Sequence, residues 1–495
     1  MVLNDVPASP SALTLKDSAL FRQQCYLDGR WSDANSSKTI DVVNPATGRR
    51  LGSVPDMGAA ETARAIEAAD RAWPAWRAKT AKERSAIIRK WSELQLAHAD
   101  DLAMILTSEQ GKPLAEAKGE ITIGAGYCEW FAEEAKRVYG DVIPTIGNDR
   151  RLVVIKEPIG VCAAITPWNF PSSMITRKVA PALAAGCTVV IKPAVATPHS
   201  ALALAELAAR AGFPPGVLNV ITGKASAIGG EMTSNPTVRK VSFTGSTEIG
   251  RVLMKQVAPT VKKISLELGG NAPFIVFDDA DLDAAAEGAI ISKYRNTGQT
   301  CVCANRLFVH DKVYDAFAAK LSERVRALKV GSGIDAGVTQ GPLINREALD
   351  KVEEHVADAT ANGAKVLVGG KRHALGGTFY EPTVLTGVTA DMKIFSEETF
   401  GPVAPLFRFK TDEEVIALAN RTEFGLASYF YSRDIGRIWR VAEALEYGMV
   451  GVNTGLITTE VAPFGGVKQS GIGREGSKYG IDEYVVVKYI CMGGI

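Results

Sequence analysis

Apolar residues recur at two different spacings along this chain, and the spacing changes near residue 158. Before that point, three long stretches place apolar residues three or four positions apart, which is the spacing of an amphipathic helix. These stretches cover residues 59–77, 81–108 and 114–138, and a Gly-Lys-Pro stop signal follows the second. We therefore predict three long helices in this part of the chain, with their tryptophan and aliphatic side chains in the core.

From residue 158 onward, short apolar runs alternate with stretches of helical length. The runs at 160–166, 188–191, 218–221 and 240–243 are predicted to be strands, with helices between them. Continuous apolar strands separated by helices indicate a parallel sheet that is covered on both faces. A sheet of this kind binds nucleotides at the carboxyl ends of its strands.

A second alternating set begins at residue 272 and predicts a second α/β domain. Its strands are expected at 272–277, 306–310, 365–368, 405–409 and 429–431. Between the two sets, residues 142–156 are expected to form a hairpin, either internal or paired with another subunit. The carboxyl tail, 484–490, alternates poorly for a half-buried strand and is expected beside that hairpin, at a subunit interface.

Composition excludes several classes of function. The 495 residues are 46% hydrophobic and 22% charged, with a net charge of +1, so nothing favours nucleic acid or an anionic membrane as a partner. No apolar run approaches the ~18–20 residues of a membrane span, and no secretory signal is expected at the start. Seven scattered cysteines indicate the reducing cytosol rather than a disulfide framework. Neither the cysteines nor the five histidines have the spacing of a metal site.

Two glycine-containing segments are candidates for phosphate binding. The strand ending at Phe243 leads into Gly245, Ser246 and a helix start, where free backbone N–H groups suit a pyrophosphate. The alternative is a plain strand–helix turn. Residues 471–476 match G-x-G-x-x-G more literally, but no clear strand precedes them, so we reject that segment.

Three residues carry candidate chemistry, each with an ordinary alternative. Asn169 follows a strand and offers an amide to a developing oxyanion, or lies in a rigid loop between two prolines. Glu267 sits in an apolar run, where burial would raise its pKa as in a general base, or where it forms a structural ion pair. Cys301 lies among small polar residues instead of aliphatic ones, which suits a thiol that meets a substrate, or else it is a loop cysteine without a function.

Several motifs in order make the chain similar to the NAD(P)-dependent aldehyde dehydrogenase superfamily over nearly its whole length. They are Asn169, Gly245-Ser246-Thr247, Glu267-Leu268-Gly269-Gly270, Gly298-Gln299-Thr300-Cys301, Glu397-Glu398-Thr399-Phe400-Gly401-Pro402 and Pro463-Phe464-Gly465-Gly466. The resemblance implies a fold with a Rossmann-type cofactor domain, an α/β catalytic domain and a small β oligomerisation arm. It places the cofactor domain at 1–138 and 158–267, the arm at 139–157 and 481–495, and the catalytic domain at 268–480.

The resemblance also implies a mechanism. Cys301 would attack the aldehyde carbon, and the Asn169 amide with the Cys301 backbone N–H would stabilise the oxyanion. Hydride transfer would leave a thioester, and Glu267 would activate the water that hydrolyses it. The implied cofactor contacts are Trp168, Lys192, Val195, Gly245, Ser246, Leu268, Glu398 and Phe400.

The residue three positions after Lys192 bears on the choice of cofactor. NAD-preferring members of the family carry glutamate there, which would repel a 2′-phosphate, but this chain has Val195. We therefore predict NADP, with NAD possible. The alternative is that Val195 only packs and that another residue sets the preference.

Two arginines indicate the substrate. Arg177 and Arg295 resemble the carboxylate-binding arginines of succinate-semialdehyde dehydrogenases, although each alone is typical of a surface ion pair. Thr458 or Thr459, with Thr459 chosen, would add a hydroxyl. We predict oxidation of succinate semialdehyde, and glutarate semialdehyde stays open because one methylene is worth only ~1–3 kcal/mol. A silent cofactor-binding protein on the same fold is the rival from another class.

Cys303 and the oligomeric state complete the predictions. Cys303 is a redox candidate that would close a strained, reversible disulfide on Cys301, or else a passive core thiol. The family implies a homo-oligomer, a dimer or tetramer.

Overall fold

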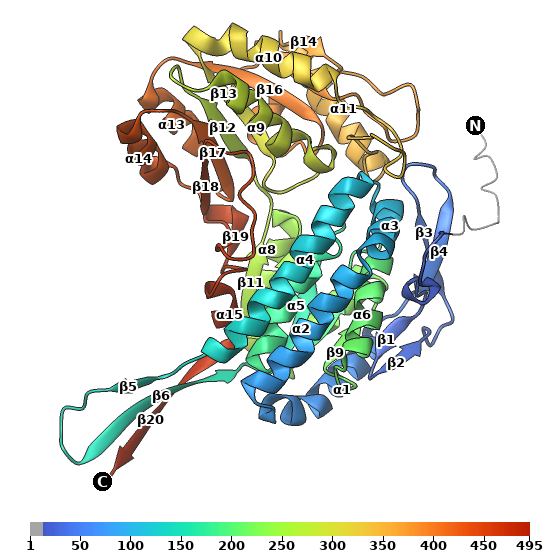
Figure 1. Cartoon of the computed structure of the whole chain (residues 1–495), viewed down its shortest axis with the longest axis vertical. Coiled ribbons are helices and arrows are strands. Elements are labelled where there is room, and N and C mark those ends of the chain that lie inside the picture. Colours follow the sequence, from blue (N-terminus) through green and yellow to red (C-terminus); the bar gives the residue numbers. More distant parts are fainter. Residues whose placement is uncertain (1–12) are drawn as a thin grey trace.

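The computed structural model describes residues 13–495, which form two α/β bodies and a projecting arm (Figure 1). The first body contains an eight-stranded sheet whose strands from β11 to β9 run parallel, as predicted. In sheet order its strands are β19 (Gly471–Ile472), β11 (Lys263–Glu267), β10 (Val238–Thr244), β7 (Val161–Ile165), β8 (Thr188–Lys192), β9 (Leu218–Val220), β1 (Cys25–Leu27) and β2 (Arg30–Ser32).

Helices cover this sheet, and one prediction among them was wrong. They are α1 (Ala59–Ala78), α2 (Ala81–Ala97), α3 (Ala99–Gln110), α4 (Leu114–Glu134), α5 (Ser173–Ala185), α6 (His199–Ala211), α7 (Ala225–Ser234) and α8 (Thr247–Val257). The single helix expected over 81–108 is divided at His98, which leaves the helical region with φ −108° and ψ 20°. Apolar spacing did not reveal this break, because one non-helical residue ends a helix without interrupting the apolar pattern.

The second body contains a seven-stranded sheet. In sheet order its strands are β14 (Lys365–Val368), β15 (Thr383–Thr386), β16 (Val403–Phe409), β13 (Ala304–His310), β12 (Ala272–Val276), β17 (Ala427–Tyr431) and β18 (Met449–Val452). Its helices are α9 (Leu282–Tyr294), α10 (Tyr314–Arg326), α11 (Arg346–Ala361), α12 (Lys393–Ser396), α13 (Asp412–Asn420) and α14 (Ile435–Ala444). The second alternating set is thus confirmed as an α/β unit, although β15 and β18 were not predicted.

The arm is a separate three-stranded antiparallel sheet that extends away from both bodies (Figure 1). It consists of β5 (Asp141–Ile143), β6 (Arg150–Pro158) and β20 (Val485–Gly493). The register of β20 on β6 runs from Val485 opposite Pro158 to Gly493 opposite Arg150. The predicted position of the tail beside the hairpin is therefore confirmed. A smaller ribbon pairs β3 (Thr39–Val43) with β4 (Arg50–Pro55).

The carboxyl ends of the parallel strands bring the candidate residues together. Asn169 follows β7, Ser246 follows β10, and Glu267 is the last residue of β11. The sheet also takes in residues from the range expected for the other domain, because β19 pairs with the end of β11. A short helix, α15 (Tyr479–Asp482), follows β19 and leads toward the arm. No helix within residues 13–495 is long and apolar enough to cross a bilayer.

Candidate active site

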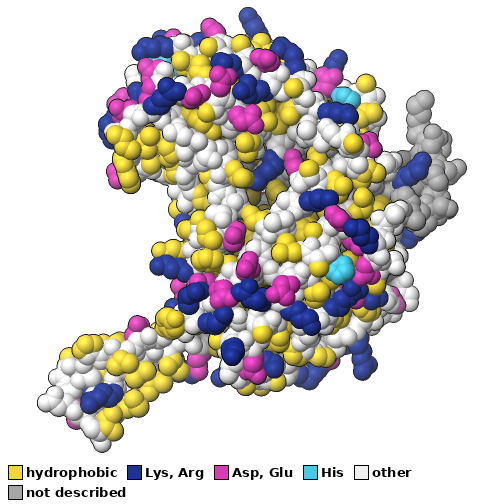
Figure 2. Space-filling model, viewed as in Figure 1, with side chains coloured by type: hydrophobic (Ala, Val, Ile, Leu, Met, Phe, Trp, Pro, Cys, Tyr) yellow, Lys and Arg dark blue, Asp and Glu magenta, His cyan; other side chains and the backbone are white. Residues whose placement is uncertain are grey.

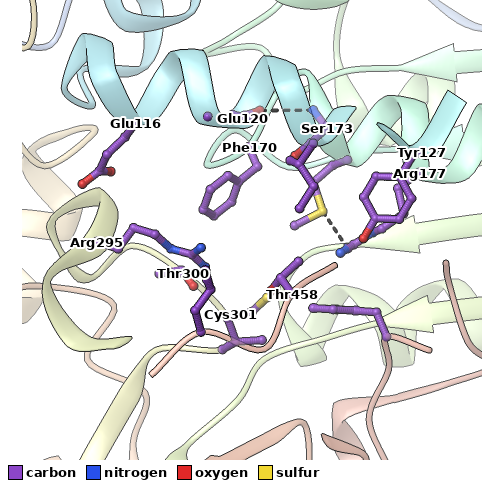
Figure 3. Close-up of a pocket in the computed structure, with 16 residues that line it drawn as sticks. Glu116, Glu120, Tyr127, Phe170, Ser173, Arg177, Arg295, Thr300, Cys301 and Thr458 are labelled. Carbon is purple, nitrogen blue, oxygen red and sulfur yellow. Dashed lines mark hydrogen bonds between the residues drawn. The ribbon is translucent and has the colours of Figure 1, made fainter. Parts of the chain in front are cut away.

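Two cavities meet at Cys301. The first, which we call the arginine cavity, has a volume of about 270 Å³ and contains Arg177 and Arg295 in its wall (Figure 3). Its other lining residues are Glu116, Gly119, Glu120, Ile123, Tyr127, Phe170, Ser173, Met174, Thr300, Cys301, Val302, Leu456, Thr458 and Phe464. The second, the glutamate cavity, has a volume of about 230 Å³. It is lined by Pro167, Trp168, Asn169, Met174, Thr244, Gly245, Ser246, Leu268, Gly269, Cys301, Glu398 and Phe400.

The Cys301 thiol is half-buried between these cavities. Burial raises its pKa to about 12; Arg177 opposes that rise, Glu398 and Glu267 add to it, and Arg295 opposes it more weakly. The backbone here is tightly packed, since a Cβ added to Gly270 would lie 2.4 Å from the Cys301 carbonyl oxygen. The glycine at 270 is therefore required by the close approach of the Cys301 loop.

The turn at residues 295–298 precedes the thiol and is strained. Asn296 and Thr297 adopt left-handed backbone conformations, with φ of 51° and 57°, at a cost of roughly 1–2 kcal/mol per residue. The Asn296 side chain anchors the turn: its Nδ2 donates to the Asn169 carbonyl at 3.0 Å, and its Oδ1 accepts from Gln110 Nε2 at 3.0 Å. Sequence reasoning missed Gln110, because no local pattern marks the end of α3 as a support for a loop 186 residues away.

Asn169 is buried in the wall of the glutamate cavity. Its Nδ2 donates to the Gln299 carbonyl at 3.0 Å, which ties the amide to the Cys301 loop and leaves its second N–H free of that bond. A buried ion pair supports the loop that carries Asn169. Lys112 Nζ lies 2.6 Å from Glu120 Oε2 and donates to the Asn169 carbonyl at 2.7 Å. The amide is thus held rigidly beside the thiol, as a preorganised donor requires.

Glu267 lies behind the site, in a cluster of buried charges. Glu475 is the centre of this cluster: Arg177 Nε and Lys178 Nζ each lie 2.5 Å from one of its carboxylate oxygens. Burial raises the pKa of Glu267 well above its usual value, and Glu475 adds to the rise while Arg177 and Lys178 oppose it. Among residues 13–495, Glu267 is not in the wall of either cavity. Its buried environment therefore favours the protonated carboxyl more strongly than water does.

Sequence reasoning also missed Glu475. It lies in the segment 471–476 that was rejected as a phosphate loop, and the same segment supplies β19. The local sequence shows only one acidic residue in a glycine-rich segment. It gives no indication of two cationic partners almost 300 positions earlier in the chain.

The two arginines enter the arginine cavity from opposite sides (Figure 3). Arg177 is buried, paired with Glu475, and lies 4.0 Å from the centre of the Phe464 ring. Arg295 is half-buried and stacks more loosely on Phe170 at 5.6 Å. Within residues 13–495, no carboxylate forms an ion pair with Arg295. Both predicted arginines therefore lie in the wall of one cavity, but Arg177 is already paired with Glu475.

The predicted hydroxyl is displaced by one residue. Thr458 lines the arginine cavity, whereas the Thr459 hydroxyl donates to the Glu460 carboxylate at 3.3 Å. Thr459, the residue we chose, is not among the residues that line this cavity, so its contact with the substrate stays a prediction.

Most of the predicted cofactor contacts gather in the glutamate cavity. Trp168 and Phe400 meet edge to face, with ring centres 5.7 Å apart. Glu398 accepts from the Gly270 N–H at 3.1 Å, and burial raises its pKa to about 7. Ser246 caps α8 and accepts from the Ile249 N–H at 3.4 Å. Leu268 and Gly245 complete the wall.

Lys192 and Val195 lie outside that wall. Lys192 is the last residue of β8, and burial lowers its pKa to about 8. Val195 is half-buried three residues further on. The structure places Lys192 beside the end of β7, since the Thr166 N–H donates to the Lys192 carbonyl at 3.1 Å.

Cys303 is turned into the core. Its thiol donates to the Lys293 carbonyl at 3.2 Å, while Cys301 faces the cavities. A disulfide between them would break that bond, and the redox switch stays a prediction. Within residues 13–495, no group of three or more His, Cys, Asp or Glu side chains is arranged to hold a metal ion.

Known proteins share this architecture over nearly the whole chain. The model of the aldehyde dehydrogenase family matches residues 31–490. The glutarate-semialdehyde dehydrogenase of Pseudomonas aeruginosa is 68% identical, covering 98% of this chain and 100% of its own length. The NADP-dependent succinate-semialdehyde dehydrogenase GabD of Escherichia coli is 66% identical, covering 97% and 100%. A crystal structure of succinate-semialdehyde dehydrogenase from Burkholderia pseudomallei superimposes with a TM-score of 0.96 at 69% identity, covering 97% and 100%.

Proposed function

Because this chain belongs to the aldehyde dehydrogenase family, we propose that it oxidises succinate semialdehyde to succinate with NADP as the acceptor. NAD is the second acceptor in this proposal, and glutarate semialdehyde is the alternative substrate because a relative of equal similarity carries that name. The observation that carries the proposal is the position of Cys301, which lines two cavities. One contains Arg295, with which no carboxylate among residues 13–495 forms an ion pair, and the other is suited to a nucleotide.

The residues of the glutamate cavity fit a nicotinamide dinucleotide. Ser246 caps the start of α8, where backbone N–H groups and the helix dipole favour a pyrophosphate. The buried Thr244 hydroxyl in the wall has no partner among residues 13–495. Glu398 would hold the nicotinamide ribose, Phe400 would lie beside the ring, and Lys192 would bond the adenosine ribose. Val195 places no negative charge near a 2′-phosphate, which supports NADP. When bound, NADP accepts the hydride that leaves the aldehyde carbon.

The chain's own residues divide the remaining chemistry among them. Cys301 Sγ gives its proton to solvent water and, as the thiolate, bonds to the aldehyde carbon, whose oxygen becomes an oxyanion. The Asn169 amide, held by Gln299, and the Cys301 N–H stabilise that oxyanion. After loss of the hydride the carbon is a thioester. Glu267 in its ionised form then removes a proton from the water that attacks the thioester, which releases succinate and the thiol.

Substrate selection falls mainly to Arg295. A short dicarboxylic semialdehyde held by its aldehyde at Cys301 extends its far carboxylate into the arginine cavity, where Arg295 offers two parallel donors. The Thr458 hydroxyl supplements this contact. Arg177 contributes positive potential from the opposite wall of this cavity, but its charge is shared with Glu475.

The architecture supports the remaining predictions of organisation. The first sheet would form the cofactor domain, the second sheet the catalytic domain, and the arm an oligomerisation element that makes a homodimer or homotetramer. Figure 2 shows hydrophobic side chains along the arm. Its exposed large hydrophobic residues include Val142, Ile146, Val487 and Tyr489. The free state of all seven cysteines supports the reducing cytosol as the compartment.

The decisive experiment compares turnover across aldehydes of graded length with each cofactor, followed by the absorbance of the reduced nicotinamide. We expect succinate semialdehyde with NADP to give the highest kcat/KM, and butanal, its neutral analogue of equal length, to be much poorer. Equal rates with butanal would contradict the role of Arg295. No reduced nicotinamide with any aldehyde would favour the silent cofactor-binding protein.

A further inference from the structure

The loop at residues 397–401 supplies two walls of the glutamate cavity, Glu398 and Phe400, and it is an unusual loop. Phe400 has a φ of 52°, in the left-handed region that aromatic residues rarely adopt. Such conformations persist only where the surroundings over-determine them. Something must therefore hold this loop in place.

Helix α11 supplies that support through one face. A Cβ added to Gly401 would lie 2.3 Å from Val352 Cγ2, so the loop is pressed directly against the helix. The same loop contacts the thiol loop on its other side, since a Cβ added to Gly298 would lie 2.2 Å from the Gly401 carbonyl oxygen. The 397–401 loop is thus packed between α11 and the segment that carries Cys301.

His355, on the same face of α11 as Val352, makes the polar contacts of this packing. Its ring is fully buried, and both of its nitrogens are engaged by residues on either side of Glu398. Nε2 lies 3.2 Å from Glu397 Oε2, and Nδ1 lies 3.1 Å from Thr399 Oγ1.

The partners determine the tautomer of this ring. A carboxylate only accepts, so Nε2 carries the proton and donates to Glu397, and the Thr399 hydroxyl donates to Nδ1. Burial lowers the pKa of His355, which agrees with a neutral ring. A neutral imidazole with one donor and one acceptor matches this pair of neighbours in a single orientation.

We propose that His355 is a positioning residue that fixes the loop on both sides of Glu398 and thereby sets the affinity of the enzyme for its nicotinamide cofactor. This inference rests on the proposed function, because it takes Glu398 as a cofactor contact. His355 itself does not line either cavity, so it acts through Glu398 and does not touch the cofactor.

The first test measures NADP binding by protein-fluorescence titration in His355→Leu, which keeps an apolar side chain but removes both hydrogen bonds. We expect the Kd for NADP to rise about tenfold, because the buried Thr399 hydroxyl and the half-exposed Glu397 carboxylate both lose their contact with the ring and the loop relaxes. The KM for succinate semialdehyde at saturating NADP should stay within about twofold of the parent. His355→Gln can restore the donor to Glu397, and His355→Asn can restore the acceptor for Thr399. We expect the Kd for NADP of each to lie between the values of the parent and of His355→Leu.

Two controls guard against a general loss of stability. His199 is equally buried, with Nδ1 against the Arg22 carbonyl at 2.9 Å, but it lies on α6 away from both cavities. We expect His199→Leu to lower the Tm while leaving the Kd for NADP unchanged. If His355→Leu does not fold, Thr399→Val removes one of the two contacts at the loop and should raise the Kd by a smaller factor. A Kd within twofold of the parent in both His355→Leu and Thr399→Val would overturn the proposal.

The second test asks whether His355 acts through Glu398. In a Glu398→Ala background, adding His355→Leu should change the Kd for NADP by less than about twofold, because the residue it positions is gone. An undiminished tenfold effect in that background would overturn the inference while leaving the proposed function intact. If Glu398→Ala alone leaves the Kd unchanged, the cofactor contact in the proposed function fails instead.

Discussion

Arg177 and Arg295 lie on opposite walls of one cavity, but their charged neighbours differ. Arg177 is buried and shares Glu475 with Lys178, so much of its charge is already compensated. Arg295 is half-buried, and no carboxylate among residues 13–495 pairs with it. Two arginines that resemble one another as motifs are therefore physically different: one stabilises a buried cluster and the other is available to a ligand.

This difference has a chemical consequence. Arg177 lowers the pKa of both Cys301 and Glu267, and for Cys301 its influence exceeds that of Arg295. We interpret the Arg177 wall as the one that tunes the reacting groups, and the Arg295 wall as the one that selects the substrate.

The largest expected effect tests whether the Arg177 wall and the Arg295 wall both act on a substrate bound at Cys301. Cys301→Ala should lower kcat at least about 10³-fold for succinate semialdehyde and butanal alike, because the nucleophile is lost whichever aldehyde is bound. Production of reduced NADP measures this. Cys303→Ala is the matched control and should retain activity, since its thiol points at the Lys293 carbonyl. Substantial activity in Cys301→Ala would show that the two walls do not act on a common Cys301 thiol.

The next effect isolates the Arg295 wall. Arg295→Gln should lower kcat/KM for succinate semialdehyde roughly 10²–10³-fold, because a substrate carboxylate in the cavity loses its charged partner. Butanal should change less than about threefold. Steady-state kinetics with both aldehydes give the ratio. Equal losses for the two would show that Arg295 supports the fold or the thiol rather than selecting the substrate.

The same substitution on the other wall should behave differently. Arg177→Gln leaves Glu475 with Lys178 as its remaining cation, so we expect the free energy of unfolding to fall by about 2 kcal/mol. Urea denaturation measures this, with Arg295→Gln as the matched control that changes it by less than about 1 kcal/mol. Activity should fall for both aldehydes by similar factors. A loss of activity confined to the carboxylated aldehyde would support the prediction that both arginines bind the substrate carboxylate.

The smallest effect concerns pH. Because burial raises the pKa of Cys301 to about 12, the thiolate fraction should rise about tenfold per pH unit without a plateau below pH 10. The rate of alkylation by iodoacetamide follows that fraction, and Cys301→Ala provides the blank. Arg177→Gln should slow alkylation roughly threefold at each pH, and Arg295→Gln less, because Arg177 opposes the raised pKa more strongly. A plateau near pH 8 in the parent would show that the thiol ionises far more readily than its burial implies.

Local pattern was sufficient for those features that depend on neighbouring residues. The alternation of apolar runs and helical stretches after residue 158 predicted the parallel strands, because strand and helix periods are visible within a few residues. Polar, small neighbours marked Cys301, and the motif around Asn169 follows the carboxyl end of β7, where parallel sheets carry their ligands. Cys301, Asn169 and Glu398 line one cavity in the structure, and their roles stay predictions.

Only the tertiary structure decided which groups pair. Glu475 lies 298 positions after Arg177, and His355 reaches Glu397 and Thr399 from another helix. Whether a guanidinium is free or already paired depends on which distant side chain packs beside it. The local periodicity of the sequence does not contain that information. The direction of a side chain in an irregular segment is equally non-local, as Thr458 and Thr459 show. The residue types were determined by the sequence, and the electrostatic state of each was determined by packing.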